Sequence, residues 1–272
     1  MAVQPRLASA VMLVRDVTDG KGQGIEVFMV RRVIQSDFMP DVYVFPGGSV
    51  SADDRAAEQT ERVCAPFDAT LADPEGRTAL GTGSRAAAIR ELFEEAGILL
   101  AYHHGEILAT SVENAARFVG YREAFNQRKA SLVEMARAEN LQLATDLLSY
   151  FAHWITPEGL PKRFNTHFFI TTAPIAQEAA YDQLETSEGI WIAPKEALAR
   201  SEQGMFPLVF ATIHQLRELA TFDSVDAALT HTATQHVPVR IPILVQDEKG
   251  ARVHLAEDAA HEWDVPDQMR KG

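Results

Sequence analysis

The chain has little cysteine and a deficit of positive charge. Cys64 stands alone among 272 residues, so no disulfide can form within the chain, which fits a reducing compartment. Lysine and arginine number 25 against 38 aspartates and glutamates, a formal net charge of −13. Surfaces that coat nucleic acid or an anionic membrane need an excess of basic residues. We therefore expect neither partner, and an anionic substrate would need metal ions to receive it.

Long apolar runs are also missing. The run from Leu7 to Val14 is too short to span a bilayer and lacks the small-residue cleavage site of a signal peptide. Hydrophobic residues nevertheless make up 46% of the chain, which is ample for a buried core. We expect a globular protein without a membrane partner, and we interpret this run as a strand.

Hydrophobic periodicity and turn residues divide the chain into strands and helices. Strands are expected at 7–15, 25–33, 42–45, 163–173, 189–193, 237–246 and 251–256. Helices are expected at 85–96, with Ser84 as N-cap and Gly97 as C-terminal stop, in a block at 111–152, and at 194–200 and 208–222. The polar stretch 49–83 has little periodicity, and we treat it as an insertion. Gly47 and Gly48, after the third strand, indicate that another group approaches the backbone closely.

Residues 90 to 97 read RELFEEAG and gather acids on one helix face. Because an α-helix turns about 100° per residue, Glu91, Glu94 and Glu95 share an arc roughly 100° wide. The opposite arc carries Ile89, Leu92, Phe93 and Ala96. Arg90 can pair with Glu94 four residues later, but one arginine cannot neutralise three acids. From spacing alone, a metal site and a solvated acidic face are equally open.

The strand ending VFPGG and the helix carrying RELFEEAGI together resemble the Nudix hydrolase signature. Residues 90–98 fit every position of its second half, Arg-Glu-aliphatic-any-Glu-Glu-any-Gly-aliphatic. The first half departs, because the family pattern has 13 residues between its glycine and its arginine, whereas 41 separate Gly48 from Arg90. The family's first glutamate stands eight residues before the arginine, where this chain has Thr82. That acid is therefore missing or is supplied from within the insertion.

An interrupted signature of this kind resembles the Nudix branch that contains the peroxisomal acyl-CoA diphosphatases. SDFMPDVYVFPGGSV, FAHWITPEGLPKRFNTHFF and ETSEGIWIAPKEAL resemble the same branch, so the likeness runs from about residue 7 to 220. It implies an α/β fold of the Nudix α/β/α sandwich type, with a mixed sheet and helical insertions. We expect one domain over 1–272, enlarged at 49–83 and 111–152. Because the chain ends in Arg270-Lys271-Gly272 rather than a peroxisomal tripeptide, we expect it in the cytoplasm.

The resemblance implies hydrolysis of a pyrophosphate bond in a nucleoside diphosphate derivative, with Mg²⁺ or Mn²⁺ as cofactor. It assigns Glu91, Glu94, Glu95 and the carbonyl of Gly48 as ligands, which are the hard oxygen donors that magnesium prefers. The metals would spread charge on the phosphoryl oxygens and lower the pKa of the attacking water. Arg90 is expected to orient the glutamates.

Family members draw the general base either from this helix or from a later loop. Glu185 and Glu188 lie in such a loop, and each is open as a base, as an extra ligand or as part of a solvated acidic turn. The nearest positive candidates for substrate phosphates are Arg31, Arg32 and Arg163. Six further side chains are interpreted as structural or as core packing: Cys64, His153, His167, Phe38, Phe164 and Phe168.

CoA or an acyl-CoA is the expected substrate. NADH, ADP-ribose and dinucleoside polyphosphates are alternatives within the same enzyme class, because a fold does not decide its substrate. An alternative of another class is a Nudix-fold protein that binds or senses a ligand without catalysis. The missing first acid keeps that alternative open, whereas the intact acidic cluster favours an enzyme. Nudix proteins are often dimers, so a homodimer is a further expectation.

Overall fold

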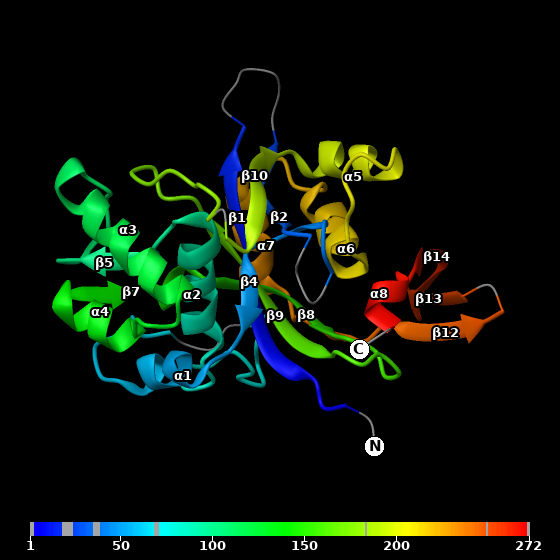
Figure 1. Cartoon of the computed structure of the whole chain (residues 1–272), viewed down its shortest axis with the longest axis horizontal. Helices are drawn as coiled ribbons and strands as arrows, with labels where there is room; N and C mark the ends of the chain where they lie inside the picture. The colour runs from blue at the N-terminus through cyan, green and yellow to red at the C-terminus, as the bar shows by residue number, and fades with distance from the viewer. Residues whose placement is uncertain are drawn as a thin grey trace.

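A mixed sheet runs through the middle of the molecule (Figure 1). The computed structural model describes residues 3–17, 24–34, 39–67, 71–182, 184–248 and 250–270. Within them the main path of the sheet is β10-β2-β1-β9-β8-β11, with β3 beside β2 and β4 beside β1. The bounds are β1 (Arg6–Asp16), β2 (Ile25–Arg32), β3 (Tyr43–Val44), β4 (Gly47–Ser49), β8 (Ser149–Ile155), β9 (Phe164–Thr172), β10 (Thr186–Ile192) and β11 (Val239–Arg240).

Helices cover both faces of this sheet, because residues of β1 alternate between two cores. Val11 and Leu13 pack toward one helical layer, and Met12 and Val14 pack toward the other. The first layer contains α1 (Ala52–Gln59), α2 (Ser84–Ala96), α3 (Val112–Asn126) and α4 (Leu132–Ala138). The second contains α5 (Pro194–Glu202), α6 (Phe210–Leu219) and α7 (Val225–Thr234). The predicted sheet between helices is confirmed, and no helix of the described residues is long and apolar enough to cross a membrane.

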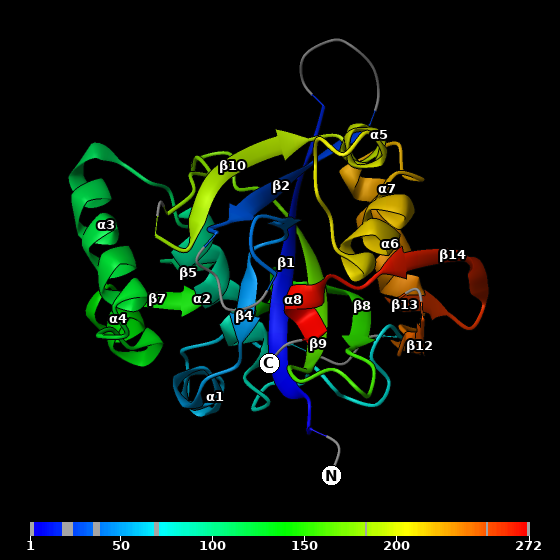
Figure 2. The ribbon, with the colours of Figure 1, turned by 45° about the vertical axis from the view of Figure 1, so that its right-hand side comes forward.

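Two smaller sheets flank the main one. Beside α2 lie β5 (Ala101–His103), β6 (Glu106–Ile107) and β7 (Leu141–Leu143). At the other end lie β12 (Ile243–Asp247), β13 (Gly250–Leu255) and β14 (Asp258–Asp264), followed by α8 (Asp267–Arg270). We call these last four elements the C-terminal module. Figure 2 shows α8 turned toward the strands of the main sheet.

Most predicted elements are confirmed, but the helical block predicted at 111–152 extends too far toward the C-terminus. Helices end at Ala138, and the run LQLATDLLSYFAHW forms β7, a 3₁₀ turn at Thr145–Leu147, and β8. The prediction failed because β8 is buried on both faces, so its apolar residues do not alternate with exposed polar ones as in a half-exposed strand.

The insertion at 49–83 is partly helical, since α1 lies within it. Residues 68–70 of the insertion lie outside the described part of the chain. Phe38, predicted as core packing, also lies outside it. The predicted N-cap of the acidic helix is off by one residue. Gly83 holds that position with φ of 83°, and Ser84 is the first residue of α2. Gly97 ends the helix as predicted, in the left-handed conformation with φ of 71°.

Candidate active site

The acids of α2 face the protein interior. Glu91 is 8% exposed and Glu95 is 4% exposed, while Glu94 is partly buried. The apolar arc of the same helix, Ile89, Leu92, Phe93 and Ala96, is buried in the core against β1. A solvated acidic face is therefore ruled out for this helix, and the crowded charges need another physical explanation.

Arg90 holds the acidic face together. Its Nη1 donates to Glu91 at 2.7 Å and to Glu94 at 3.3 Å, and its Nη2 donates to the carbonyl of Ser49 at 3.0 Å. Nε and Nη2 donate to the two oxygens of Asp54 at 2.8 and 2.9 Å. Burial alone lowers the pKa of Arg90, but these carboxylates hold it above its ordinary value. Arg90 thus has the orienting position that the sequence predicted.

Asp54 is the acid that sequence reasoning missed. It is fully buried in α1, within the insertion, and it forms the paired hydrogen bonds to Arg90. Counting backward from Arg90 leads to Thr82, whose side chain donates to a backbone carbonyl of its own turn. Counting forward from Gly48 with the family spacing leads to Asp54, so the extra residues follow the first acid instead of preceding it. The forward count was the signal that could have found it.

A second acid of the insertion anchors the start of α2. Glu58 accepts hydrogen bonds at 2.6–3.0 Å from the backbone N–H groups of Gly81, Gly83, Arg85 and Ala86. These donors have no partner within the helix, and a carboxylate there also interacts favourably with the helix dipole. The insertion therefore positions the acidic helix from both its N-terminus and its polar face.

The glycine pair on β4 brings backbone against the acids. Gly47 N–H donates to Glu95 Oε2 at 2.9 Å. A Cβ built on Gly48 would lie 2.4 Å from Glu91 Oε1, so a side chain there would displace the carboxylate, and a Cβ on Gly47 would lie 2.5 Å from the carbonyl oxygen of Ser9. Strand β4 is fixed by pairing with β1, where Ser9 is opposite Gly48. The close approach predicted from the two glycines is confirmed.

The pKa values of the three acids show that their negative charge is poorly compensated. Burial raises the pKa of Glu91 to about 7, although Arg90 opposes the shift. Burial also raises the pKa of Glu94, and burial followed by the charge of Glu91 raises that of Glu95 well above its usual range. A divalent cation would relieve this repulsion, and carboxylates with a backbone carbonyl are suitable donors for magnesium. The residues present therefore fit the metal that the resemblance implies.

The side chains do not stand in a finished ligand arrangement. Across the described ranges, no three acidic, histidine or cysteine side chains are grouped so that they could hold a metal ion. The contacts of Arg90 explain this, because its Nη1 lies between Glu91 and Glu94. Cation binding requires these carboxylates to turn from the guanidinium toward a shared centre.

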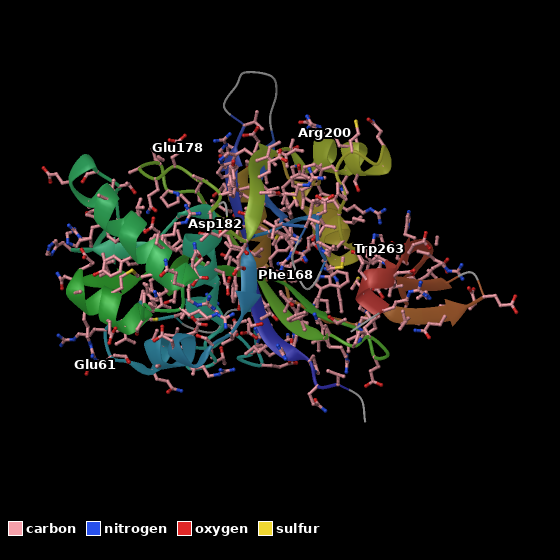
Figure 3. All side chains as sticks on the ribbon, viewed as in Figure 1. Glu61, Phe168, Glu178, Asp182, Arg200 and Trp263 are labelled. Carbon is pink, nitrogen blue, oxygen red and sulfur yellow. The ribbon has the colours of Figure 1, made fainter. Side chains whose placement is uncertain are left out.

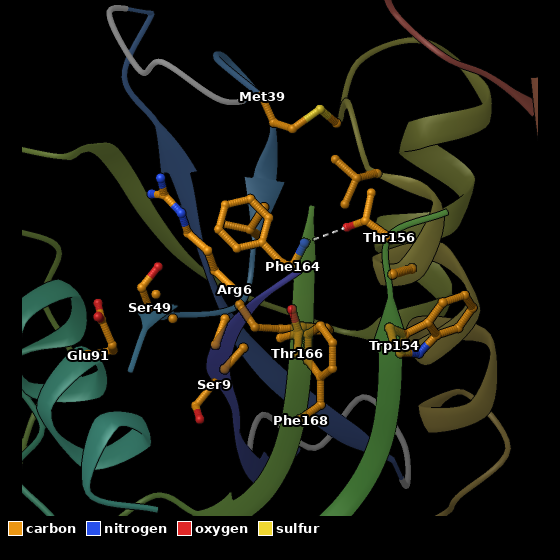
Figure 4. Close-up of a pocket in the computed structure, with 18 of the residues that line it drawn as sticks. Arg6, Ser9, Met39, Ser49, Glu91, Trp154, Thr156, Phe164, Thr166 and Phe168 are labelled. Atoms are coloured by element: carbon orange, nitrogen blue, oxygen red, sulfur yellow. Dashed lines mark hydrogen bonds between the residues drawn. The ribbon is translucent and has the colours of Figure 1, made fainter. Parts of the chain in front are cut away.

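A pocket of about 830 Å³ opens beside the acids (Figure 4). Six of the predicted site residues line it: Arg32, Gly48, Arg90, Glu91, Glu94 and Glu185. Glu95 lies behind the glycine backbone that it binds. In Figure 4, Glu91 and Ser49 mark one end of the pocket, and Trp154 lies at the other, with Thr166 and Phe168 between them.

The fold separates the two candidates for the general base. Glu185 lines the pocket, and its charge contributes to the raised pKa of Glu94 and Glu95. Glu188 instead accepts a hydrogen bond from the Tyr43 hydroxyl at 2.6 Å. These glutamates are three positions apart in sequence, but Glu185 precedes β10, whereas Glu188 lies within it opposite Arg31, the β2 residue that is in turn opposite Tyr43.

The three arginines predicted to contact substrate phosphates lie in different surroundings. Arg32 lines the pocket, whereas Arg31 pairs with Asp41 at 2.8 Å and Arg163 donates to the carbonyls of Thr156 and Val3. Arg163 is buried, and these bonds place its guanidinium in the fold rather than among the residues that line the pocket. Arg31 is likewise engaged away from the pocket.

Two arginines that sequence reasoning missed, Arg6 and Arg128, line the pocket from exposed positions. Figure 4 shows the Arg6 side chain extending on the side of Ser49. Arg6 begins β1, and Arg128 follows α3 with φ of 57°. Nothing in the local sequence of either residue marks it as part of a site.

The buried histidines have the structural role expected of them. His167 Nδ1 lies 3.1 Å from Ser84 Oγ, and His153 Nδ1 lies 3.2 Å from Arg77. Their rings meet edge to face with centroids 4.6 Å apart. Burial lowers the pKa of His167 to about 3, so the imidazole stays neutral beneath the start of α2. Of the predicted core aromatics, Phe168 is buried and Phe164 half-buried, and both also line the pocket.

Comparison with known proteins agrees with this geometry. The family model of the NUDT19 Nudix domain matches residues 79–218, just over half of the chain. "Putative nudix hydrolase 7" of Caenorhabditis elegans is 29% identical over 199 residues, covering 71% of this chain and 55% of the relative. "Acyl-coenzyme A diphosphatase NUDT19" of Gallus gallus is 28% identical over 240 residues, covering 74% of this chain and 62% of the relative. The chain thus spans less than two thirds of the length of these two relatives.

A solved structure supports the fold. The crystal structure of a NUDIX hydrolase from Alicyclobacillus acidocaldarius is similar with a TM-score of 0.67 and 24% sequence identity. The similarity covers 84% of this chain and 96% of that one. The sandwich of sheet and helices is therefore shared across nearly the whole of that protein.

Proposed function

Because the chain belongs to the Nudix hydrolases, in their NUDT19 branch, we propose that it hydrolyses the pyrophosphate linkage of CoA or an acyl-CoA. One observation carries the proposal: buried carboxylates of α2 meet the Gly47–Gly48 backbone at one end of a deep pocket. The relative named as an acyl-coenzyme A diphosphatase supports the choice of substrate.

Magnesium or manganese is the proposed cofactor, held by Glu91, Glu94, Glu95 and the carbonyl of Gly48. Bound there, it would supply compensation of charge on the phosphoryl oxygens and a lower pKa for a bound water. Arg90 and Asp54 keep the carboxylates on one face through their hydrogen bonds. The chain thus contributes an acidic surface for the metal rather than a nucleophile of its own.

Glu185 is the proposed general base. It lies at the acidic end, next to the pocket, on the loop that leads into β10. Its carboxylate can accept a proton from a water that attacks a phosphorus atom, provided that the two come within hydrogen-bond distance. Arg6, Arg32 and Arg128 are the proposed contacts for substrate phosphates, because each lines the same pocket in a chain of strongly negative net charge.

A catalytically inactive binding protein is the weaker candidate. The missing first acid favoured it, but Asp54 supplies a carboxylate against Arg90 from within the insertion. NADH, ADP-ribose and dinucleoside polyphosphates remain alternatives within the enzyme class.

The test is a hydrolysis panel with Mg²⁺ or Mn²⁺ and CoA, acyl-CoA, NADH, ADP-ribose and dinucleoside polyphosphates, in which the phosphorylated products are measured. Cleavage of CoA or acyl-CoA in preference to the others is expected. Glu94→Gln and Glu95→Gln should abolish it. No cleavage at any metal concentration would favour the binding protein.

A matched pair tests the base. Glu185→Gln should lower kcat by about 10²- to 10⁴-fold, which is the usual contribution of general acid–base catalysis. Glu188→Gln makes the same chemical change three residues away, at a side chain bound to Tyr43, and should leave kcat near that of the wild type. Equal losses in both variants would remove Glu185 from this role.

A further inference from the structure

The end of the pocket farthest from the acids is apolar. Trp154, Leu160, Phe164, Phe168 and Phe210 line it, drawn from β8, β9, α6 and the loop between the two strands. The polar groups beside them are threonine hydroxyls and the indole N–H of Trp154, which is buried without a hydrogen-bond partner among the described residues. The hydroxyl of Thr156 already accepts from the backbone N–H of Phe164 (Figure 4). This end is therefore suited to an uncharged, apolar group.

A floor of small side chains joins the two ends. Across the sheet, Ser49 of β4 is opposite Ala8 of β1, which is opposite Thr166 of β9, and Thr166 is opposite Trp154 of β8. Residues that are opposite each other in a sheet point to the same face. Three strand spacings of about 4.8 Å place the first and last of these residues roughly 14 Å apart. A long, thin substrate can therefore lie across the strands from the acids to the apolar end.

The C-terminal module forms the outer wall of the apolar end. The pocket is lined by Val253 of β13, Trp263 of β14, Met269 of α8, and Val265 from the link between β14 and α8. Figure 3 shows Trp263 on this module, away from Phe168 at the centre of the sheet. The module lies outside residues 79–218, the segment that matches the Nudix family model. It is an addition to the matched segment, and it contributes its apolar side chains to the same pocket as the acids.

We propose that the apolar end binds the acyl chain of an acyl-CoA and that Trp263 and Met269 of the C-terminal module set the chain length it accepts. The proposal rests on the proposed function, because the acids place the diphosphate at the other end. In an acyl-CoA, the pantetheine arm separates the anhydride from the acyl group. The order along the substrate, anhydride then arm then acyl chain, therefore matches the order along the pocket, acids then small-residue floor then apolar wall.

The experiment compares CoA with hexanoyl-, dodecanoyl- and hexadecanoyl-CoA in the full-length protein. The kcat/KM for hydrolysis is measured with Mg²⁺, and the Kd is measured in EDTA, where no turnover occurs. The wild type should prefer dodecanoyl-CoA to CoA by at least about tenfold, since burying the methylenes of the acyl chain favours binding. Trp263→Ala and Met269→Ala should reduce the ratio of kcat/KM for dodecanoyl-CoA to kcat/KM for CoA by about three- to tenfold.

Two matched controls and a filling variant accompany these changes. Trp191→Ala removes a tryptophan that packs on Phe28, and Met205→Ala removes an exposed methionine, so both should keep the acyl preference. Ala211→Phe adds bulk to the apolar end from α6, and should exclude hexadecanoyl-CoA while CoA is still cleaved.

The outcomes separate the two proposals. Cleavage of CoA with no acyl preference, or with a preference that Trp263→Ala leaves unchanged, would overturn the acyl site and leave the enzyme intact. If no CoA species is cleaved, the proposed function is overturned. In that case the apolar site is still upheld if dodecanoyl-CoA binds with a lower Kd than CoA and Trp263→Ala abolishes this difference. The Kd of ADP is measured in the same way as a probe of nucleotide binding. If Trp263→Ala raises the Kd of ADP as much as that of dodecanoyl-CoA, the C-terminal module binds the adenine base of the substrate, and the acyl proposal is wrong.

Discussion

The acidic end of the pocket and its apolar end are built from different kinds of contact. At the acidic end, Arg90, Asp54 and Glu58 position α2 through directed hydrogen bonds between charged groups and backbone. At the apolar end, Trp154, Phe168 and the side chains of the C-terminal module meet through packing. Directed bonds between charges fix atoms for chemistry, whereas apolar surfaces tolerate a ligand whose length varies. We therefore expect substitutions at the acidic end to change metal binding and stability, and substitutions at the apolar end to change only the preference for the acyl chain.

The largest expected effect is on stability at the acidic end. Arg90→Ala should lower the free energy of unfolding by about 3–5 kcal/mol, because it leaves the buried carboxylates of Asp54 and Glu91 without their partner. Chemical denaturation measures this. Arg200→Ala breaks an exposed pair with Glu196 on α5 and should change stability by at most about 0.5 kcal/mol. Comparable losses in both variants would show that the buried ion network does not hold this end.

Metal binding should act on the acidic end alone. A saturating divalent cation at a hundredfold its Kd should stabilise the protein by about 2.7 kcal/mol, a rise in Tm of roughly 5–10 °C that EDTA reverses. Glu94→Gln should remove most of this rise. Met269→Ala, at the apolar end, should retain it in full. A cation-induced rise that survives Glu94→Gln would place the metal elsewhere.

The insertion should hold the acidic helix through Glu58. Glu58→Gln replaces one acceptor oxygen with an NH₂ group and leaves two N–H groups at the start of α2 without an acceptor, so we expect a loss of about 2 kcal/mol in unfolding free energy. Glu61→Gln, two residues past α1 and 88% exposed, is the matched control and should be neutral. If both variants have wild-type stability, the insertion does not anchor the helix.

The smallest expected effect concerns the neutral imidazole under α2. Burial holds the pKa of His167 near 3, below its usual 6.5, so the unfolded chain takes up a proton first as the pH falls. Its contribution is fully present above pH 6.5 and decreases as the pH falls below that value, by about 1 kcal/mol between pH 6.5 and 5.5. His167→Gln should therefore have a flatter stability profile than the wild type across this range. Parallel profiles would contradict a buried neutral His167.

The acidic end was largely predictable from sequence, and the apolar end was not. Helical angles placed Glu91, Glu94 and Glu95 on one face, and the glycine pair indicated the close backbone approach that Gly48 makes. These predictions succeeded because they rest on residues near each other in the chain, where local geometry is nearly fixed. Their assignment as metal ligands stays a prediction. The helix predicted at 141–152 failed because burial on both faces, which removes the alternation of buried and exposed residues from β8, is a property of the whole fold.

The sequence by itself determined which side chains of RELFEEAG share a helix face, because helical geometry is local, and the resemblance of that segment and its glycine pair to the Nudix signature indicated the class of chemistry. Tertiary structure decided which distant residues join them. Strand pairing places Glu185 at the pocket and Glu188 beside Tyr43. The insertion places Asp54 against Arg90, and the C-terminal module places Trp263 at the apolar end of the pocket. Such meetings depend on the pairing of strands and the packing of layers over long separations, for which no local pattern in the chain encodes the outcome.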